Sequence, residues 1–133
     1  MVNARRRKTT QMIKKLALWL CSLASLTVSA APIEGKATFY ADHYEGNETA
    51  YGERYRSHLL TCATYEFPYG TKLLVTYISA AGTERSVIVR VNDRGPSAKY
   101  REQGRIIDLS KAAFRTLENL DRGVIKVRVQ EVQ

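Results

Sequence analysis

Hydrophobic and polar residues alternate along two segments in the second half of the chain. In residues 86–91 three valines occupy every second position, and Arg90 lies between two of them. Residues 125–130 repeat the pattern, with one isoleucine and two valines alternating with lysine, arginine and glutamine. Successive side chains of a β-strand point to opposite faces, so each segment predicts a strand with one face in a core.

The remaining pattern adds further strands and a helix. Residues 35–40 and 71–78 are short runs rich in β-branched and aromatic residues, which is typical of strands. Residues 111–120 carry an apolar stripe at helical spacing, with Ser110 placed to cap the start and Gly123 following the end. Five or six short strands with one or two short helices predict a mostly β fold, a small closed barrel.

The first part of the chain differs from the rest in charge and hydropathy. Six basic residues and no acid precede residue 32, and the uncharged, largely apolar run 16–28 is followed by Ser29, Ala30 and Ala31. This order is typical of an export signal. We expect residues 1–31 to be cleaved, residues 32–133 to form one domain, and the product to lie in the periplasm or cell envelope.

Two other interpretations of this leader, a retained membrane anchor and a lipid anchor, fit its residues less well than cleavage. A retained anchor is the alternative, but the apolar run is shorter than the ~20 residues of a spanning helix. A lipid on Cys21 is not expected, because the bulky Leu20 precedes it.

The net charge of +8 falls mostly on the leader, and the later residues carry 15 bases against 13 acids. We therefore expect no nucleic acid partner.

One cysteine, Cys62, remains after the leader, with two histidines, His43 and His58. A single cysteine forms no internal disulfide, and this set is poor in zinc ligands. We expect no metal and no cofactor. No histidine lies near Cys62 in sequence, so a small core residue is the preferred interpretation over a nucleophile.

Two aspartates are the candidates for chemistry. The alternation of residues 86–91 extends to Asp93, at the point where the strand meets a turn, and Asp108 lies in a strongly apolar stretch. An apolar environment raises the pKa of a carboxyl, as a general acid requires, whereas Arg90 and Arg94 would favour the ionised form of Asp93. Structural roles are the alternative: Asp93 could cap its turn, and Asp108 could serve the following helix or pair with Arg105 or Lys111.

Six blocks of residues together resemble one known family: 35–40, 49–55, 60–63, 67–71, 89–96 and 105–110. The Asn92–Pro96 and Arg105–Ser110 blocks are the specific ones. On these blocks the chain resembles the RlpA family (rare lipoprotein A), the double-psi β-barrel lytic transglycosylases of the bacterial envelope, and more distantly expansins and family-45 glycosidases.

The resemblance implies a six-stranded double-psi β-barrel and a specific reaction. Family members cleave peptidoglycan glycan strands that lack stem peptides, and the 6-hydroxyl of MurNAc attacks its own anomeric carbon to leave a 1,6-anhydro end. Asp93 matches the essential aspartate of the family, and Asp108 matches the second one, as a supporting acid or an orienting group. Thr64 stands where the family has an essential histidine. The family also commonly has a histidine before the glycine of a turn motif, whereas this chain has Tyr44 and Glu45 before that glycine.

The turn-rich region 42–55 contains candidate sugar-binding residues. Tyr44, Tyr51 and Tyr55 are expected to border a groove, with ordinary packing as the alternative. Arg94 is a candidate partner for the lactyl carboxylate of MurNAc. Glu45 and Thr64 complete the expected binding residues, and His43 or Glu45 could supply a group exchanging protons near the glycan.

Three functions follow from these residues. The first is a lytic transglycosylase with Asp93 at its centre. The second is an expansin-like peptidoglycan-binding protein with weakened catalysis, because Thr64 replaces the histidine. The third is a barrel that serves only as an interaction module. We expect the first, with glycan strands as the partner and the protein a monomer.

Overall fold

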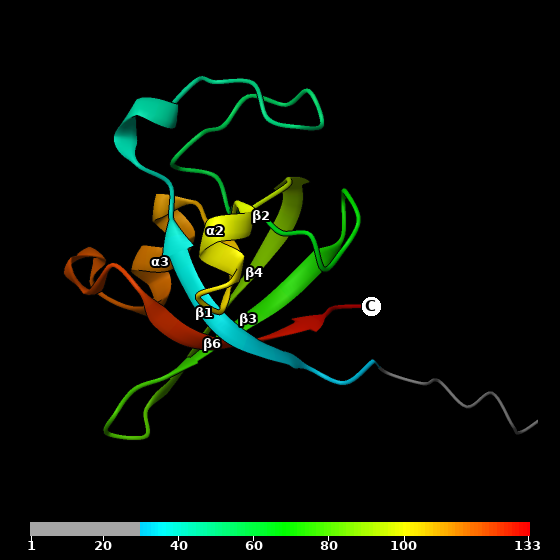
Figure 1. Cartoon of the computed structure of the whole chain (residues 1–133). Coiled ribbons are helices and arrows are strands. Elements are labelled where there is room, and N and C mark those ends of the chain that lie inside the picture. Colours follow the sequence, from blue (N-terminus) through cyan, green and yellow to red (C-terminus); the bar gives the residue numbers. More distant parts are fainter. Residues whose placement is uncertain (1–29) are drawn as a thin grey trace, which may run out of the picture.

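Six β-strands close into a barrel in the computed structural model, which describes residues 30–133 (Figure 1). Around the barrel the order is β1-β5-β2-β4-β3-β6, so most neighbours are distant in sequence. The predicted mostly β, six-stranded closed barrel is confirmed. The strands are β1 (Ile33–Phe39), β2 (Thr61–Ala63), β3 (Lys72–Ile78), β4 (Glu84–Asp93), β5 (Arg105–Leu109) and β6 (Ile125–Glu131).

The barrel combines parallel and antiparallel pairs. β1 runs parallel to β5 and β2 runs parallel to β4, whereas the other four pairs are antiparallel. β1 and β2 follow each other in the chain but are not paired, and we call the connection between them the crossover. The crossover from β1 to β2, residues 40–60, lies over one end of the barrel, where it rises above the strands in Figure 1.

The core fills the barrel with the inward side chains that the alternation predicted. The valines of β4 and the Ile125, Val127 and Val129 side chains of β6 are all buried. Cys62 is completely buried, and burial raises the pKa of its thiol to about 12. The interpretation of Cys62 as a small core residue is confirmed.

Within residues 30–133, two α-helices and two 3-10 helices lie in the connections between the strands. Ser110 caps α3 as predicted, because its side chain accepts a hydrogen bond from the Ala113 backbone N–H at 3.2 Å. The predicted end at residue 120 is wrong: α3 ends at Leu117 because Glu118 has extended backbone angles. The helices are η1 (Asp42–Tyr44), α2 (Ala98–Arg101), α3 (Lys111–Leu117) and η2 (Leu120–Arg122).

The expected leader falls almost entirely outside the described residues, so its cleavage stays a prediction. Among residues 30–133, no helix is both long and apolar enough to span a membrane.

Candidate functional site

Asp93 and Asp108 come from different strands and meet beside one residue of a third. Ala63 of β2 pairs with Asp93 of β4 on one side and with Asp108 of β5 on the other. Gly95 then passes over the pair: a Cβ at this position would lie 3.3 Å from both the Ala63 Cβ and Asp108 Oδ2. The short strand β2 therefore brings together two carboxylates that are 15 residues apart in the chain.

Asp93 accepts three hydrogen bonds, which use both of its oxygens. The Tyr40 hydroxyl donates to Oδ2 at 2.6 Å, and the backbone N–H groups of Ala50 and Arg94 donate to Oδ1 at 2.8 Å each. Burial, and then the hydrogen bond to Asp93, raise the pKa of Tyr40 far above its usual value, so its hydroxyl remains a donor. These bonds fix the direction of the Asp93 carboxylate. The bond from Arg94 also shows that Asp93 caps its own turn.

Asp108 has the opposite environment. Burial raises the pKa of its carboxyl, and the Asp93 charge adds to this shift, while the Thr38 hydroxyl and Arg105 act against it. The Thr38 Oγ1–Oδ1 distance is 2.5 Å. Neither Arg105 nor Lys111 forms a salt bridge with Asp108 within residues 30–133, and Lys111 pairs with Asp42 instead. Asp108 thus suits a proton donor rather than an ion-pair partner.

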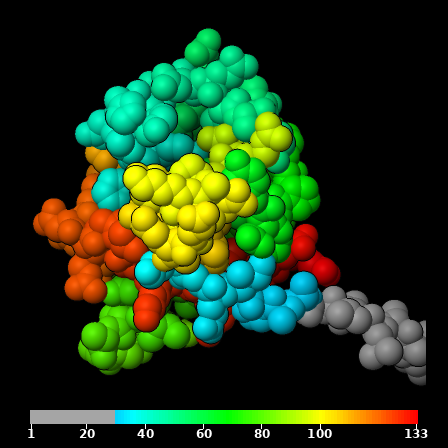
Figure 2. Space-filling model, viewed as in Figure 1, coloured from blue at the N-terminus to red at the C-terminus, as the bar shows by residue number. Residues whose placement is uncertain are grey.

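Both carboxylates line one open cavity of about 420 Å³. Its walls come from the crossover after β1 and from the segment that contains α2. In Figure 2 the α2 segment (yellow) lies directly below the crossover (cyan to teal) on this face. The lining residues are Thr38, Phe39, Tyr40, Ala41, His43, Tyr44, Ala63, Asp93, Arg94, Gly95, Pro96, Ser97, Tyr100, Arg105 and Asp108.

Arg90 does not act on Asp93 as the sequence suggested. Its guanidinium binds both carboxylate oxygens of Glu53, at 2.6 and 2.8 Å. The Tyr69 hydroxyl and the Asn92 side chain also donate to Glu53, and with Arg90 they lower the pKa of this carboxyl to about 2. Since Arg90 lies on the outward face of β4, its partner must come from outside the barrel.

The Glu53–Arg90 pair holds the crossover against β4. The crossover also carries Ala50, whose N–H binds Asp93. Glu53 is therefore a positioning residue that sequence reasoning missed. Its signal was present in the opposite charges of Glu53 and Arg90, but their separation of 37 residues hid it.

Three expected binding residues are exposed near the cavity. Tyr44 is 43% exposed and lines the cavity, together with His43. Arg94 lines both this cavity and an adjoining hollow of about 310 Å³, and its guanidinium lies 5.5 Å from the Tyr51 ring centre. Tyr51 in turn stacks on Tyr69 at 4.9 Å. Tyr44, Tyr51 and Arg94 thus border a continuous groove.

Two further aromatic residues of the groove were not predicted. Tyr100 of α2 is 39% exposed beneath the Arg105 guanidinium, and Tyr65 is 51% exposed beneath Arg101, each at 4.3 Å. Neither tyrosine lies in the region 42–55, where aromatic residues were sought.

The other three expected binding residues have different positions. Tyr55 is only 2% exposed, stacks on Tyr40 at 4.2 Å and therefore supports that ring from behind. Thr64 is equally buried, and its hydroxyl is used by the Ile106 carbonyl and the Glu66 N–H. Tyr55 does not border the groove, because its side chain is packed into the domain. Thr64 is also buried, but it lines the adjoining hollow of about 310 Å³ with Tyr51 and Arg94.

Glu45 lines a neighbouring hollow rather than the carboxylate cavity. Its carboxylate accepts a hydrogen bond from the Ser57 N–H at 2.8 Å and lies 3.7 Å from Arg56. The hydrogen bond from Ser57 lowers the pKa of Glu45, so this carboxyl is unsuited to donate a proton. Of the two groups considered for proton exchange, only His43 lines the cavity with Asp93 and Asp108.

Residues 30–133 contain no group of three or more His, Cys, Asp or Glu side chains arranged to hold a metal ion. In the cavity, the Tyr40 hydroxyl donates to Asp93 and the Thr38 hydroxyl donates to Asp108.

Comparison with protein families gives a match over residues 33–129 to the family described as lytic transglycolase. The match confirms the double-psi form of the barrel. Among curated proteins, the chain is 43% identical over 100 residues to an endolytic peptidoglycan transglycosylase RlpA of Pasteurella multocida, and 41% identical over 99 residues to a probable one of Nostoc. These alignments cover 75% and 73% of this chain but 32% and 25% of the relatives.

Solved structures with similar folds have varied functions. A Streptomyces papain inhibitor superposes with a TM-score of 0.60 and 28% identity, over 80% of this chain and 98% of that one. The expansin of Clavibacter michiganensis superposes with a TM-score of 0.57 and 28% identity, over 77% of this chain and 50% of that one. A mutant of the same expansin has been solved with cellohexaose. The fold alone therefore does not decide between catalysis and binding.

Proposed function

The chain belongs to the lytic transglycolase family, and from this premise we propose that it cleaves peptidoglycan glycan strands as an endolytic lytic transglycosylase. The chain spans about a quarter to a third of the length of the relatives it matches, so their activity supports the proposal without deciding it. The observation that carries it is the pairing of Asp93 and Asp108 about Ala63, in one cavity but in opposite environments.

The different environments suit two different roles in the reaction. Asp93, oriented by three donors, takes the proton from the MurNAc 6-hydroxyl as the oxygen attacks the anomeric carbon. Asp108, whose pKa is raised by burial, gives its proton to the leaving glycosidic oxygen. One C–O bond forms and one breaks within the sugar strand, so no water is consumed and a 1,6-anhydro end results.

A preference for strands without stem peptides follows from the arginines of the groove. Arg94, Arg101 and Arg105 each lie over a tyrosine ring, and none forms a salt bridge within residues 30–133. A free lactyl carboxylate, which MurNAc carries only after peptide removal, fits such a guanidinium. The leader 1–31 supports export to the envelope, where this substrate occurs.

The test is mass spectrometry of the products from peptide-free glycan strands. The wild-type protein should release fragments with 1,6-anhydroMurNAc ends, and Asp93→Asn should lower the rate by about 10³-fold. Asp121→Asn, an exposed aspartate of η2, is the matched control and should leave the rate unchanged. Products with reducing ends, or equal rates for wild type and Asp93→Asn, would contradict the proposal.

The structure also favours one alternative, a glycan-binding protein with little turnover. The hydroxyl of Thr64 is committed to Ile106 and Glu66, so this position supplies no proton carrier to the cavity. In that case strands would bind the groove and co-sediment with the protein while no fragments appear. If fragments do appear, His43→Ala should abolish turnover only if the imidazole acts in the cavity.

A further inference from the structure

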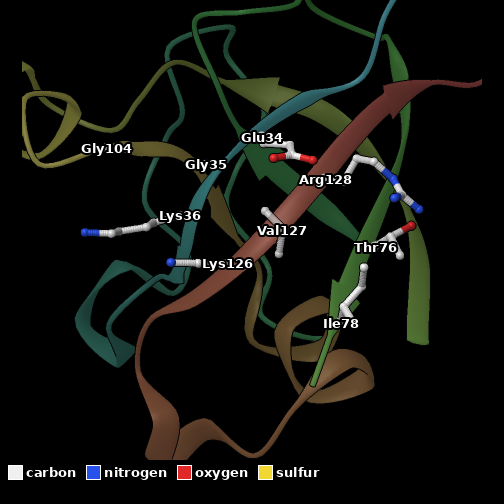
Figure 3. A pocket seen from close by; sticks show the side chains of 9 residues that line it. All are labelled: Glu34, Gly35, Lys36, Thr76, Ile78, Gly104, Lys126, Val127 and Arg128. Carbon is white, nitrogen blue, oxygen red and sulfur yellow. The ribbon is translucent and has the colours of Figure 1, made fainter. Parts of the chain in front are cut away.

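A second concave surface lies at the other end of β1 from the carboxylates. Its main hollow measures about 550 Å³ and lies over β1, β3 and β6 (Figure 3). A smaller hollow of about 330 Å³ continues it and shares Lys36, Ile78 and Lys126 with it. We call the two together the basic groove, lined chiefly by Glu34, Lys36, Ile78, Arg122, Lys126 and Arg128.

The groove contains a pair of like charges. Lys36 of β1 and Lys126 of β6 are directly opposite each other in the antiparallel register. Figure 3 shows both side chains leaving neighbouring strands on the same side of the hollow. Like charges directly opposite on two strands destabilise a sheet. This arrangement therefore weakens the fold unless an anion lies between the two ammonium groups.

Carboxylates of the described chain do not neutralise this pair. Lys36 donates only to the Gln103 carbonyl, at 3.0 Å, and among residues 30–133 neither lysine forms a salt bridge. Arg128 is paired with Glu84 at 3.2 Å, and Arg122 is exposed and without a salt bridge in the same range. With Arg128 paired, the bases Lys36, Arg122 and Lys126 against the lining acid Glu34 leave the groove with a net positive charge.

The floor of the groove is apolar and open. Gly35 and Gly104 line the groove with backbone and carry no side chains. Ile78 of β3 is 49% exposed and lies across β6 from them. A floor of this kind, bordered by lysines, fits a narrow chain with small apolar side chains and carboxylates. A concave surface fits a flat lipid surface poorly.

The chain itself supplies no such segment. Residues 1–31 carry basic residues but no acid, so the leader would be repelled from the groove. A second copy would bring the same positive surface. An acidic chain therefore suits the groove better than the leader or the same surface of a second copy.

We propose that the basic groove binds the stem peptide of peptidoglycan, a short acidic peptide whose alanine methyl groups and free carboxylates match the floor and the lysines. The inference rests on the proposed function only in placing the protein at the cell wall. The protein would then hold a peptide-bearing strand on one side of the barrel while its carboxylates act on a bare strand at the other end of β1.

The test is an NMR titration of the ¹⁵N-labelled domain with a synthetic stem tetrapeptide in free-acid form. Amide shifts should appear in residues 34–36, 76–78 and 126–128, and the peptide with amidated carboxyls should bind at least about tenfold more weakly. Lys126→Glu should weaken binding of the free acid by at least about tenfold, and the effect should shrink in high salt. Arg115→Glu, the same charge change on an exposed position of α3, should leave binding unchanged.

The same variant gives a second readout that a merely structural lysine would not. Lys126→Glu places opposite charges across the strand pair, so its Tm should rise while peptide binding falls. Unchanged binding in Lys126→Glu, or no amide shifts in the groove, would overturn the proposal. Binding of phosphatidylglycerol vesicles but not of the peptide would also overturn it, in favour of a membrane surface.

The outcome is separable from the fate of the proposed function. Lys126→Glu should cleave bare strands at the wild-type rate, and Asp93→Asn should bind the stem peptide with wild-type affinity. If the wild-type protein yields no anhydro products, the titration still decides whether the groove binds the peptide.

Discussion

The polar groups at the two ends of β1 differ in whether they have partners within the described part of the chain. At the Thr38–Tyr40 end, three donors bind Asp93, the Thr38 hydroxyl binds Asp108, and the Glu53–Arg90 pair holds the crossover above them. At the Glu34–Lys36 end, two lysines oppose each other without a carboxylate partner among residues 30–133. The hydrogen bonds of the carboxylates fix their geometry, as a reaction requires. The two lysines, which have no such partner, are available to bind an anionic ligand. The comparison separates a preorganised site from a recognition surface.

Removing the Glu53–Arg90 pair should disturb the preorganised end most. Glu53→Gln would break the charged interaction with Arg90, let the crossover move and displace the Ala50 N–H from Asp93. We expect kcat/KM on peptide-free strands to fall by about 100-fold. The free energy of unfolding should fall by only about 1 kcal/mol, because both side chains are partly exposed.

Glu48→Gln is the matched control, an exposed glutamate of the same crossover, and should leave kcat/KM unchanged. Equal rates for Glu53→Gln and wild type would show that the crossover needs no clamp to keep Asp93 oriented.

Tyr40→Phe should have a smaller effect on the same end. The variant keeps the ring contact with Tyr55 but loses the 2.6 Å hydrogen bond to Asp93. We expect kcat to fall by about tenfold, since one hydrogen bond to a charged group is lost. KM and Tm should stay near wild-type values. Steady-state kinetics with defined glycan strands make the measurement, and a loss confined to KM would argue against an orienting role.

Asp108→Asn should show how much the raised pKa of Asp108 lowers the stability of the folded protein at neutral pH. The folded protein holds the Asp108 proton to a higher pH than the unfolded chain, so stability falls as pH rises from about 4 through the folded pKa. The variant has no such proton to lose. Its Tm should exceed that of wild type by a few degrees at pH 7, and the difference should vanish near pH 3.

Calorimetry from pH 3 to pH 7 is the measurement. If the Tm difference between Asp108→Asn and wild type stays constant over this range, burial of the Asp108 carboxyl does not destabilise the folded protein as described.

Thr38→Val should produce the smallest change. The Thr38 hydroxyl lowers the pKa of Asp108 by donating to its charged form, so its removal raises that pKa further. If Asp108 acts as the acid, the alkaline limb of the pH–rate profile should move to higher pH, with little change in the maximal rate. A shift to lower pH would assign that limb to another group.

Four of the six strands, β1, β3, β4 and β6, were predictable because each follows a local rule, whereas β2 and β5 were not predicted. Alternation in residues 86–91 and 125–130 gave β4 and β6, and it also gave the direction of Asp93. Ser110 gave the start of α3. The closure of the barrel depends instead on parallel pairs between distant strands, which no local pattern encodes. The pairing of Asp93 with Asp108 about Ala63 is one consequence.

The crossover of residues 40–60 was the least predictable region. It has no periodicity, and contacts with distant residues decide which of its side chains are exposed. Tyr55 was expected at the surface but packs behind Tyr40. Thr64, just beyond the crossover, is buried, and its hydroxyl forms hydrogen bonds with the Ile106 carbonyl and the Glu66 N–H. The Lys36–Lys126 pair was hidden for the same reason, since only the register of β1 and β6 brings the two together.

The burial of Cys62 has a chemical consequence under the proposed export to the envelope. A thiol reacts with disulfides and oxidants through its thiolate, and a pKa of about 12 leaves only about one molecule in 10⁵ in that form at neutral pH. Its sulfur is also inaccessible, with no exposed surface. An unpaired cysteine can therefore persist in an oxidising compartment, where a similar thiol at the surface would cross-link or form mixed disulfides.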